Sequence, residues 1–171
     1  MNTLSQTEQQ LELLRELGNL FEEIGESFWL RGGWAIDFRT GRVLRDHDDL
    51  DLVAMSSAEL PIAEKLEAAG FESIFVNSKQ TDFRKNGVDV QILFLTHAED
   101  GSLYPKGIPE WIWMSDCLDL HIHDLNGTRA RALSSRQLLA EKLDYERIGR
   151  PKREKDAASK ELLRQLIEEG R

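Results

Sequence analysis

The chain has 171 residues, of which 40% are hydrophobic and 31% are charged, and its formal net charge is −9. These values are typical of an ordinary globular protein, and we expect a single domain over residues 1–171. The acidic charge argues against broad nucleic-acid binding and would attract a cationic small molecule, although solubility alone is the simpler explanation for it.

Neither a membrane span nor a signal peptide can be recognised in the sequence. No apolar run approaches the ~20 residues that cross a bilayer, and the polar start lacks a basic segment. The single cysteine, Cys117, cannot form an internal disulfide, and we expect it to be a small buried residue. We therefore expect a cytoplasmic protein with no membrane partner.

The spacing of apolar residues predicts helices and strands in a mixed order. In chain order these are a helix over 6–26, a strand at 27–30, a brief helix at 34–38, a strand at 48–55, a helix over 58–69, strands at 72–76, 80–85 and 88–95, strands near 117–124 and 128–133, and helices over about 135–148 and 153–168. Two Asn-Gly pairs, Asn86-Gly87 and Asn126-Gly127, predict hairpins. The pattern predicts an α/β (α+β) fold with a mixed β-sheet flanked by helices.

Two details of the helix over 58–69 can be stated in advance. Ser56-Ser57 are placed to cap its first turn, and Gly70 is placed to end it. Its inward face is expected to carry Leu60, Ala63 and Leu66.

The most informative stretch contains Asp49 and Asp51 on one predicted strand. Because side chains alternate along a strand, the two carboxylates share a face, roughly 6.6 Å apart at Cα, while Leu50 and Leu52 face the core. Two such charges at ~4 Å repel by about 4 kcal/mol at an effective dielectric near 20, and a divalent cation would reverse that cost. A solvated strand face is the alternative explanation.

A third carboxylate, Asp89, lies on another apolar strand between Val88 and Val90. If the two strands are neighbours, Asp89 completes a site of three carboxylates for Mg²⁺, with Mn²⁺ as the other candidate. Gly32-Gly33 follow a strand and open a helix, so their N–H groups can approach a triphosphate, although a simple tight turn would use the same residues. A phosphate cradle followed by carboxylates on two strands is what two-metal phosphoryl transfer requires.

At these residues the sequence resembles a known family. The matching residues are Gly32-Gly33-Trp34-Ala35-Ile36-Asp37, then Gly41-Arg42-Val43, then Arg45 through Leu52, with Lys142, Gly149-Arg150-Pro151-Lys152 and Lys155-Asp156 near the end. They resemble the aminoglycoside and lincosamide nucleotidyltransferases, especially the aminoglycoside-2''-adenylyltransferase branch of the DNA polymerase beta-like nucleotidyltransferase superfamily. The resemblance implies a catalytic core at about 27–96 and a C-terminal helical part at about 134–169.

The resemblance also implies an activity and its residues. Asp49 and Asp51 would bind two Mg²⁺ ions, and Asp89 would bind the ion nearer the acceptor and draw the proton from its hydroxyl. Gly32 and Gly33 would hold the phosphates of ATP or another nucleoside triphosphate, with Arg45 or Lys142 neutralising further charge. The expected reaction transfers a nucleoside monophosphate to a hydroxyl of a small molecule such as an aminoglycoside or lincosamide antibiotic.

Two other functions remain open at this point. A toxin-type relative would modify a macromolecule such as tRNA, and the basic run from Arg147 to Lys155 is compatible with that. A non-catalytic relative would only bind nucleotide, which does not require three aspartates. Gln91 departs from the family pattern, because related enzymes often have Glu or His two positions after the third aspartate.

Several aromatic residues and histidines have two interpretations each. His47 either orients the metal ligands or contacts the nucleotide, or it is an ordinary hydrogen-bonded histidine at the end of the strand. His121 and His123 favour a solvated strand face over a metal site, and Trp29 and Trp34 favour core packing over base stacking. The last pair, Trp111 and Trp113, either lines an acceptor cleft or packs in the core.

Overall fold

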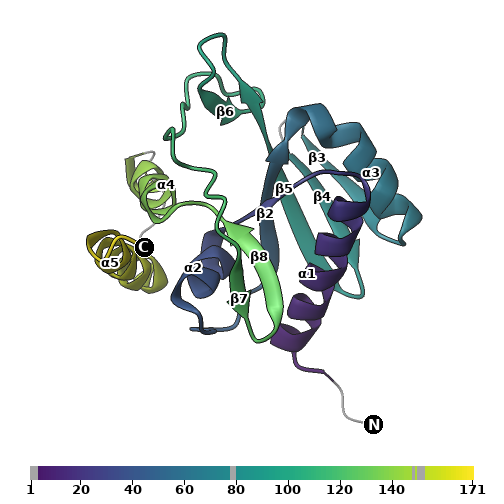
Figure 1. Ribbon diagram of the computed structural model, residues 1–171, viewed down its shortest axis with the longest axis horizontal. Coiled ribbons are helices and arrows are strands. Elements are labelled where there is room, and N and C mark those ends of the chain that lie inside the picture. Colours follow the sequence, from purple (N-terminus) through teal and green to yellow (C-terminus); the bar gives the residue numbers. More distant parts are fainter. Residues whose placement is uncertain (1–3, 78–79, 148, 150–152) are drawn as a thin grey trace.

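The computed structural model describes residues 4–77, 80–147, 149 and 153–171 (Figure 1). Within these residues the helices are α1 (Gln6–Glu23), α2 (Gly32–Thr40), α3 (Glu59–Ala68), α4 (Ser135–Arg147) and α5 (Glu154–Glu168), with a 3₁₀ turn η1 (Ser56–Ala58). The strands are β1 (Trp29–Arg31), β2 (Asp49–Met55), β3 (Glu72–Asn77), β4 (Gln80–Lys85), β5 (Val88–His97), β6 (Leu103–Pro105), β7 (His123–Leu125) and β8 (Thr128–Ala132).

One mixed sheet joins all of these strands. Its order is β3-β4-β5-β2-β1-β8-β7, and β6 pairs with β5 off this path. The pairs β2–β5 and β1–β8 are parallel, whereas the other pairs are antiparallel. The predicted fold class, a mixed sheet flanked by helices, is therefore confirmed.

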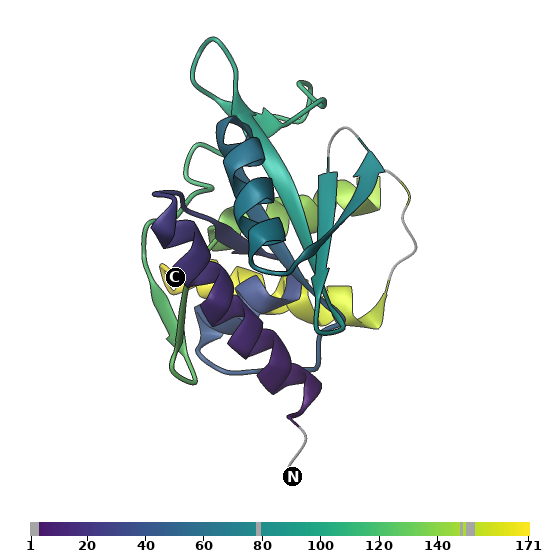
Figure 2. The same ribbon diagram turned by 90° about the vertical axis from the view of Figure 1, so that its right-hand side faces the viewer.

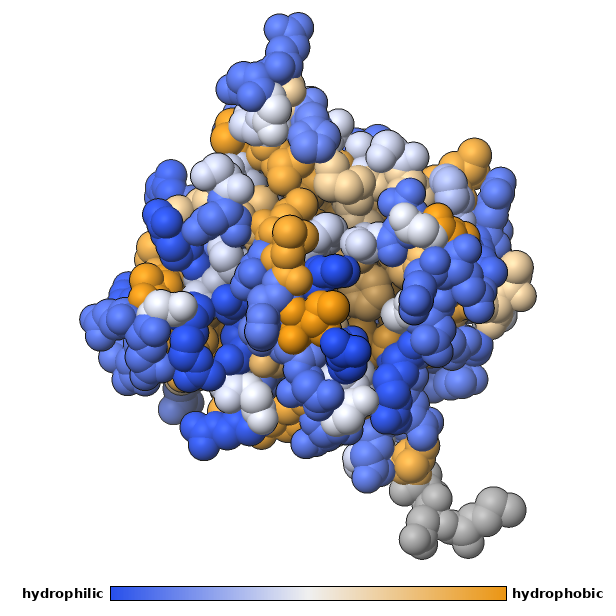
Figure 3. Space-filling view, viewed as in Figure 1, coloured by the Kyte–Doolittle hydropathy of each residue, from blue (hydrophilic) through white to orange (hydrophobic). Residues whose placement is uncertain are grey.

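Helices cover the sheet from both sides. Figure 2 shows α1 and α3 in front of the sheet and α4 and α5 behind it. The alternation of β2 follows this layering, because Leu50 and Leu52 are fully buried while Asp49 and Asp51 are only partly so. Val88 and Val90 of β5 are buried in the same way. Most of the surface seen in Figure 3 is hydrophilic, as the composition indicates.

Both predicted hairpins are confirmed. Asn86 and Gly87 join β4 to β5 with φ angles of 52° and 76°, and Asn126 and Gly127 join β7 to β8 with φ angles of 51° and 80°. Two successive residues at positive φ form the turn whose twist matches that of paired strands. This geometry explains why Asn-Gly occupies both turns.

The α3 region differs from the prediction in two respects. Ser56 and Ser57 form the 3₁₀ turn η1 instead of capping the helix with a side chain. Leu60 was expected to face inward, but it is 67% exposed, and Ile62 is buried together with Leu66. The buried side of α3 is therefore defined by Ile62 and Leu66, which are four residues apart and lie on one face of the helix.

Other boundaries also differ. The first helix ends at Glu23 instead of 26, because Gly25 has a φ of 69°. The second begins at Gly32 instead of 34, so both glycines of the pair belong to its first turn. The strand expected near 117–124 is limited to β7 and an isolated bridge between Leu118 and Leu133.

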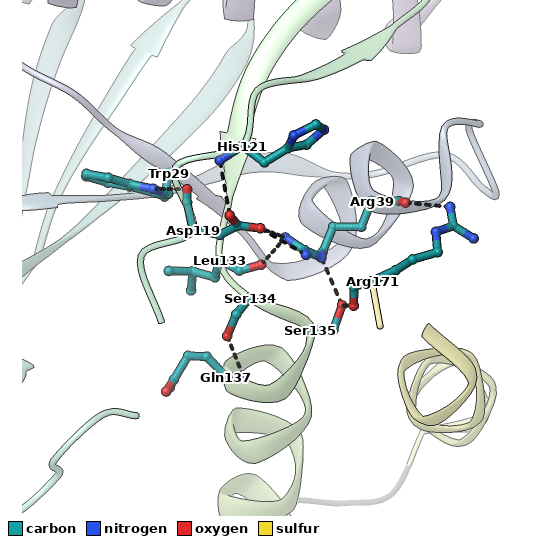
Figure 4. A network of polar contacts seen from close by, with 9 residues as sticks. All are labelled: Trp29, Arg39, Asp119, His121, Leu133, Ser134, Ser135, Gln137 and Arg171. Carbon is teal, nitrogen blue, oxygen red and sulfur yellow. Dashed lines mark hydrogen bonds and ion pairs between the residues drawn. The ribbon is translucent and has the colours of Figure 1, made fainter. Parts of the chain in front are cut away.

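A polar network centred on Arg39 ties α2 to the start of α4 and to the chain's last residue (Figure 4). Arg39 is 8% exposed, and its guanidinium donates to the side chains of Asp119 and Ser135. Arg171 donates to the Arg39 carbonyl, and its own carbonyl accepts from Ser135. These contacts hold the start of α4 and the end of the chain against α2. Within the described residues, no helix is both long and apolar enough to cross a bilayer.

Candidate active site

Polar side chains cross the sheet in two parallel rows. In the first row the register partners are, in order, Arg31 of β1, Asp51 of β2, Gln91 of β5 and Asp82 of β4. In the second row they are Asp49 of β2, Asp89 of β5 and Arg84 of β4. The strands β2 and β5, which carry the aspartates, are therefore neighbours, which is the condition for a shared site of three carboxylates. Asp49 lies directly opposite Asp89.

The side chain of Asp89 does not join the other two carboxylates. Its Oδ1 atom accepts from Arg84 Nε at 2.6 Å, and both side chains are about half exposed. Within the described part of the chain, no group of three His, Cys, Asp or Glu side chains is arranged to hold a metal ion. The backbone thus brings the three aspartates to neighbouring strands, but their side chains do not gather into one group. The Asp89 carboxylate is instead neutralised by Arg84, its neighbour on β4.

Asp51 has a buried carboxylate oxygen, Oδ1, that lacks a hydrogen-bond donor among the described residues. Burial raises the pKa of Asp51 to about 7, with repulsion from Asp49 adding to the effect and Arg31 opposing it. The pKa of Asp49 is also raised, by burial first and then by Asp48 and Asp89.

These carboxylates fit a divalent cation. Two largely desolvated carboxylates on adjacent positions of one strand face destabilise each other unless a positive charge is supplied. Their donor atoms are all oxygens, which is the set that Mg²⁺ and Mn²⁺ prefer. The residues expected to be ligands therefore suit the ion in chemical type and in charge.

The Gly32-Gly33 pair lies against this strand. A Cβ atom on Gly32 would meet Asp51 Oδ2 at 2.7 Å, and Gly32 has a φ of 67°. A Cβ atom on Gly33 would lie 2.5 Å from the His47 ring and 2.7 Å from Arg45 Nη2. Both glycines are thus required by close approach, and the N-terminal amides of α2 have no side-chain cap. Such uncapped amides are suited to anions.

A cavity of about 350 Å³ lies between the sheet and the C-terminal helices. Six of the seven residues singled out in the sequence line it, namely Gly32, Gly33, Arg45, Asp49, Asp51 and Lys142. Asp89 is the exception, although Gln91 from the same strand lines the cavity. The cavity thus joins the glycine turn, two of the aspartates and both C-terminal helices.

The two expected phosphate-binding cations differ in their surroundings. Arg45 is exposed and donates only to the carbonyl of Asp46 among the hydrogen bonds of the described chain. Lys142 Nζ donates to Asp156 Oδ1 at 3.2 Å, and burial lowers its pKa despite that partner. Lys155 also lines the cavity. Arg45 is therefore the more available of the two expected residues.

His47 packs against the glycine turn, with its ring next to Gly33. It lies in the loop before β2, and its Nε2 atom is 2.6 Å from Asp37 Oδ2 in a pair that is almost completely buried. Its carbonyl accepts hydrogen bonds from Gln6 and Gln10. The hydrogen-bonded interpretation of His47 is confirmed, and its ring also lines the cavity beside Gly33.

The remaining aromatic and histidine residues have mainly structural positions. Trp29 and Trp34 are buried, and their indole N–H groups donate to the Asp119 carbonyl and to Gln10. Trp113 is also buried, whereas Trp111 is half-buried and donates to Asp144. None of Trp29, Trp111 and Trp113 lines the cavity, so core packing describes them better than a cleft. Trp34 is buried in the core but also borders the cavity.

The histidine pair only partly matches a solvated strand face, because His121 is exposed and precedes β7, whereas His123 is half-buried and its Nε2 atom has no hydrogen-bond partner among the described residues. The rings of His121 and His123 pack edge to face at 4.5 Å, and burial, followed by Arg39 and His121, lowers the pKa of His123 to about 4. The described residues form no metal cluster around them. Cys117 is fully buried, as expected.

The sequence did not reveal a second group at the cavity, formed by Arg31, Glu141 and Tyr145. Arg31 Nε donates to Glu141 Oε2 at 3.1 Å, and Arg31 Nη2 donates to the Tyr145 hydroxyl at 2.7 Å. All three residues line the cavity. Helical spacing indicates that α4 has a buried side, but nothing local shows that this side meets β1, which is 110 residues away in the chain.

Comparison with known proteins places these residues in a family context. The profile described as aminoglycoside-2''-adenylyltransferase matches residues 13–163. A lincosamide resistance protein from Staphylococcus haemolyticus is 35% identical over 54 residues, which are 32% of this chain and 34% of that protein. A 2''-aminoglycoside nucleotidyltransferase from Klebsiella pneumoniae is 46% identical over 43 residues, which are 25% of this chain and 24% of that protein. The matched stretches thus span about a third or less of these curated relatives.

Solved structures extend the similarity to almost the whole chain. The antibiotic-resistance factor ANT(2'')-Ia has a TM-score of 0.80 at 19% identity, covering 95% of this chain and 86% of that one. The lincosamide antibiotic adenylyltransferase LnuA, solved with lincomycin, has a TM-score of 0.71 at 20% identity, covering 96% and 99%. At these identities the match establishes a shared fold. Because the family profile itself extends over most of the sequence, the chain belongs to the aminoglycoside-2''-adenylyltransferase family.

Proposed function

We propose that this protein is a Mg²⁺-dependent nucleotidyltransferase that transfers AMP from ATP to a hydroxyl of a small molecule, such as an aminoglycoside or a lincosamide antibiotic. The observation that carries the proposal is the placement of Asp49 and Asp51, with an unpartnered buried oxygen, directly beside the Gly32-Gly33 turn. Family membership supports the reaction class.

In this proposal the acidic strand face holds the metal. Asp49 and Asp51 are the ligands, and their raised pKa values reflect burial and repulsion from neighbouring carboxylates, which a bound cation would offset. When bound, Mg²⁺ would neutralise charge on the phosphates and orient them for attack. The choice of Mg²⁺ over Mn²⁺ and the presence of two ions remain predictions.

The triphosphate would be held by the start of α2. The amides at Gly32 and Gly33 donate to phosphate oxygens, aided by the positive end of the helix dipole. Arg45 supplies an exposed positive charge at the same turn, and Lys142 supplies another from α4. Selection of ATP over other nucleoside triphosphates is not determined by these contacts and remains a prediction.

Asp89 would act on the acceptor. The acceptor oxygen attacks the α-phosphorus, the bond to the pyrophosphate oxygen breaks, and the acceptor proton passes to the Asp89 carboxylate. This role requires Asp89 to leave Arg84, and the half-exposed ion pair between them is weak enough to break. Gln91, on the same strand, cannot take the proton because its side chain is an amide.

The alternative macromolecular acceptor gains no support from the described residues. Of the basic run between 147 and 155, residues 148 and 150–152 lie outside the described part of the chain. Arg147 is paired with Asp144, and Arg153 with Asp156. The location in the cytoplasm and the extent of the single domain remain predictions.

A labelling experiment separates these functions. The protein is incubated with α-labelled ATP, Mg²⁺ and, in separate reactions, tobramycin, lincomycin or bulk tRNA. Label on a drug together with pyrophosphate release is expected. Label on tRNA would replace the proposal with the macromolecular one, and no label in any reaction would favour a non-catalytic nucleotide-binding protein.

A further inference from the structure

Glu141 of α4 lines the cavity and has one carboxylate oxygen that no described residue uses. The residue is 4% exposed and lines the cavity, and its Oε1 atom is buried with no hydrogen-bond partner among the described residues. A buried carboxylate oxygen without a donor is costly, so such an atom at a cavity wall indicates a missing partner.

The other oxygen of Glu141 is fixed in place. Oε2 accepts from Arg31 Nε at 3.1 Å, and the same guanidinium is held by the Tyr145 hydroxyl. Because Arg31 is the register partner of Asp51, Glu141 is anchored one strand away from the proposed metal ligand. Glu141 also adds to the repulsion that raises the pKa of Asp51, so the two carboxylates are near enough to interact. The orientation of Oε1 is therefore set before any ligand arrives.

Two of the cations that line the cavity, Arg45 and Lys155, lie where it meets a second pocket. Gly33, Arg45 and Lys155 also line an adjoining pocket of about 360 Å³, and neither Asp51 nor Glu141 reaches it. The cations that remain available for phosphate thus gather at the glycine turn. Of the two carboxylates with an oxygen that is unpartnered among the described residues, Asp51 lies against the first glycine of the turn, whereas Glu141 lines the cavity from α4 and is not among the nearest neighbours of either glycine. An acceptor bound on the α4 side of the cavity would meet Glu141.

We infer that Glu141 is a specificity-determining residue of the acceptor site and that its Oε1 atom accepts a hydrogen bond from a protonated amine of the acceptor. An amine suits this position better than a hydroxyl because its positive charge adds Coulomb attraction to the hydrogen bond with a buried carboxylate, which a neutral hydroxyl does not. This inference rests on the proposed function, since it assumes an acceptor in the cavity.

The test compares E141Q with the wild-type protein in pyrophosphate release at saturating ATP and Mg²⁺, with tobramycin as the varied acceptor. In E141Q the amide oxygen remains to accept from Arg31, which turns the NH₂ group towards the cavity. We expect the KM for tobramycin to rise about 10- to 100-fold, as for the loss of a hydrogen bond to a charged group. The KM for ATP should stay within twofold. E161Q, which removes an exposed charge on α5, is the matched control and should leave both values unchanged.

Two further measurements keep the test decisive. N-acetylated tobramycin should be a poorer acceptor than tobramycin for the wild type, and E141Q should lose this discrimination. Equilibrium binding of tobramycin in the presence of Mg²⁺ and a non-hydrolysable ATP analogue should weaken by the same factor as KM. If E141Q unfolds, the double variant R31Q/E141Q removes both charges of the pair and allows the same measurements.

The outcomes distinguish the inference from the function on which it rests. If the wild type modifies no acceptor, the proposed function fails. If the wild type is active but E141Q changes the tobramycin KM by less than twofold, Glu141 is not an acceptor residue. A rise in the KM for ATP, an altered Mg²⁺ requirement or equal use of the N-acetylated drug by the wild type would also overturn the inference.

Discussion

Asp49 and Asp89 are direct register partners on the parallel strands β2 and β5, yet the Asp89 carboxylate is bound by Arg84 from the strand on its far side. The backbone therefore places Asp89 next to Asp49, whereas the ion pair with Arg84 keeps the Asp89 carboxylate on the other side of β5. Arg84 is about half exposed, so the pair is reversible in water. In the proposed mechanism, the pair between Asp89 and Arg84 has to open before Asp89 can take the acceptor proton.

Removing the Asp89 carboxylate should abolish most of the activity. D89N keeps the shape of the side chain but cannot take the acceptor proton, so we expect kcat to fall about 100- to 10,000-fold. The KM for ATP should change little, because Asp89 does not line the cavity. Steady-state pyrophosphate release measures both values, and a kcat within threefold of the wild type would exclude Asp89 as the base.

Releasing Asp89 from its partner should have the opposite effect on metal use. In R84Q the carboxylate is free to approach Asp49, and we expect half-maximal activity at a lower Mg²⁺ concentration, by about two- to threefold. A Mg²⁺ titration at fixed ATP measures this. R136Q, which breaks an exposed pair with Asp116 elsewhere, serves as the control. A higher Mg²⁺ requirement in R84Q would mean that Arg84 assists catalysis.

The Asp51 carboxylate should make metal-free stability depend on pH. Its pKa in the folded protein is about 7 against an ordinary value of 3.8, so the folded state holds a proton that the unfolded chain releases. The free energy of unfolding should therefore fall as pH rises from about 4 to about 7. D51N removes the charge, so we expect its free energy of unfolding at pH 8 to exceed that of the wild type by about 1–3 kcal/mol. Denaturant titration measures both values.

The same variant tests the metal role. D51N should lose transfer activity, and Mg²⁺ should no longer raise its melting temperature, whereas Mg²⁺ should stabilise the wild type. Thermal unfolding in EDTA and in Mg²⁺ measures both proteins. Equal stabilisation of D51N and wild type by Mg²⁺ would argue against Asp51 as a ligand.

A methyl group on the second glycine should disturb the phosphate cradle. The added Cβ in G33A would lie 2.5 Å from the His47 ring, which the buried Asp37 contact prevents from moving freely. We expect the KM for ATP to rise about tenfold and the melting temperature to fall by several degrees. G18A is the control, because nothing lies within 4 Å of that position on α1. It should be neutral or slightly stabilising.

Local rules were sufficient for much of the fold. Alternation on β2 placed Leu50 in the core and Asp51 on the polar face because side-chain direction along a strand has a fixed period. The two Asn-Gly turns followed from the positive φ angles that such hairpins require. The Gly32-Gly33 turn and the pair Asp49 and Asp51 could be identified because each motif is contiguous in sequence.

Only the tertiary structure decided which distant groups meet. The pairing of β2 with β5 brought Asp89 beside Asp49 but also beside Arg84, and the packing of α4 against β1 joined Glu141 to Arg31. The exposure of Leu60 also depended on packing, because apolar residues at Leu60 and Ile62 allow two inward faces and only the contacts of α3 select the one with Ile62 and Leu66. The sequence by itself determined the local geometry and the type of chemistry, because both depend on neighbouring residues. Side-chain partners depend on how the sheet and helices pack, and that is a property of the whole chain.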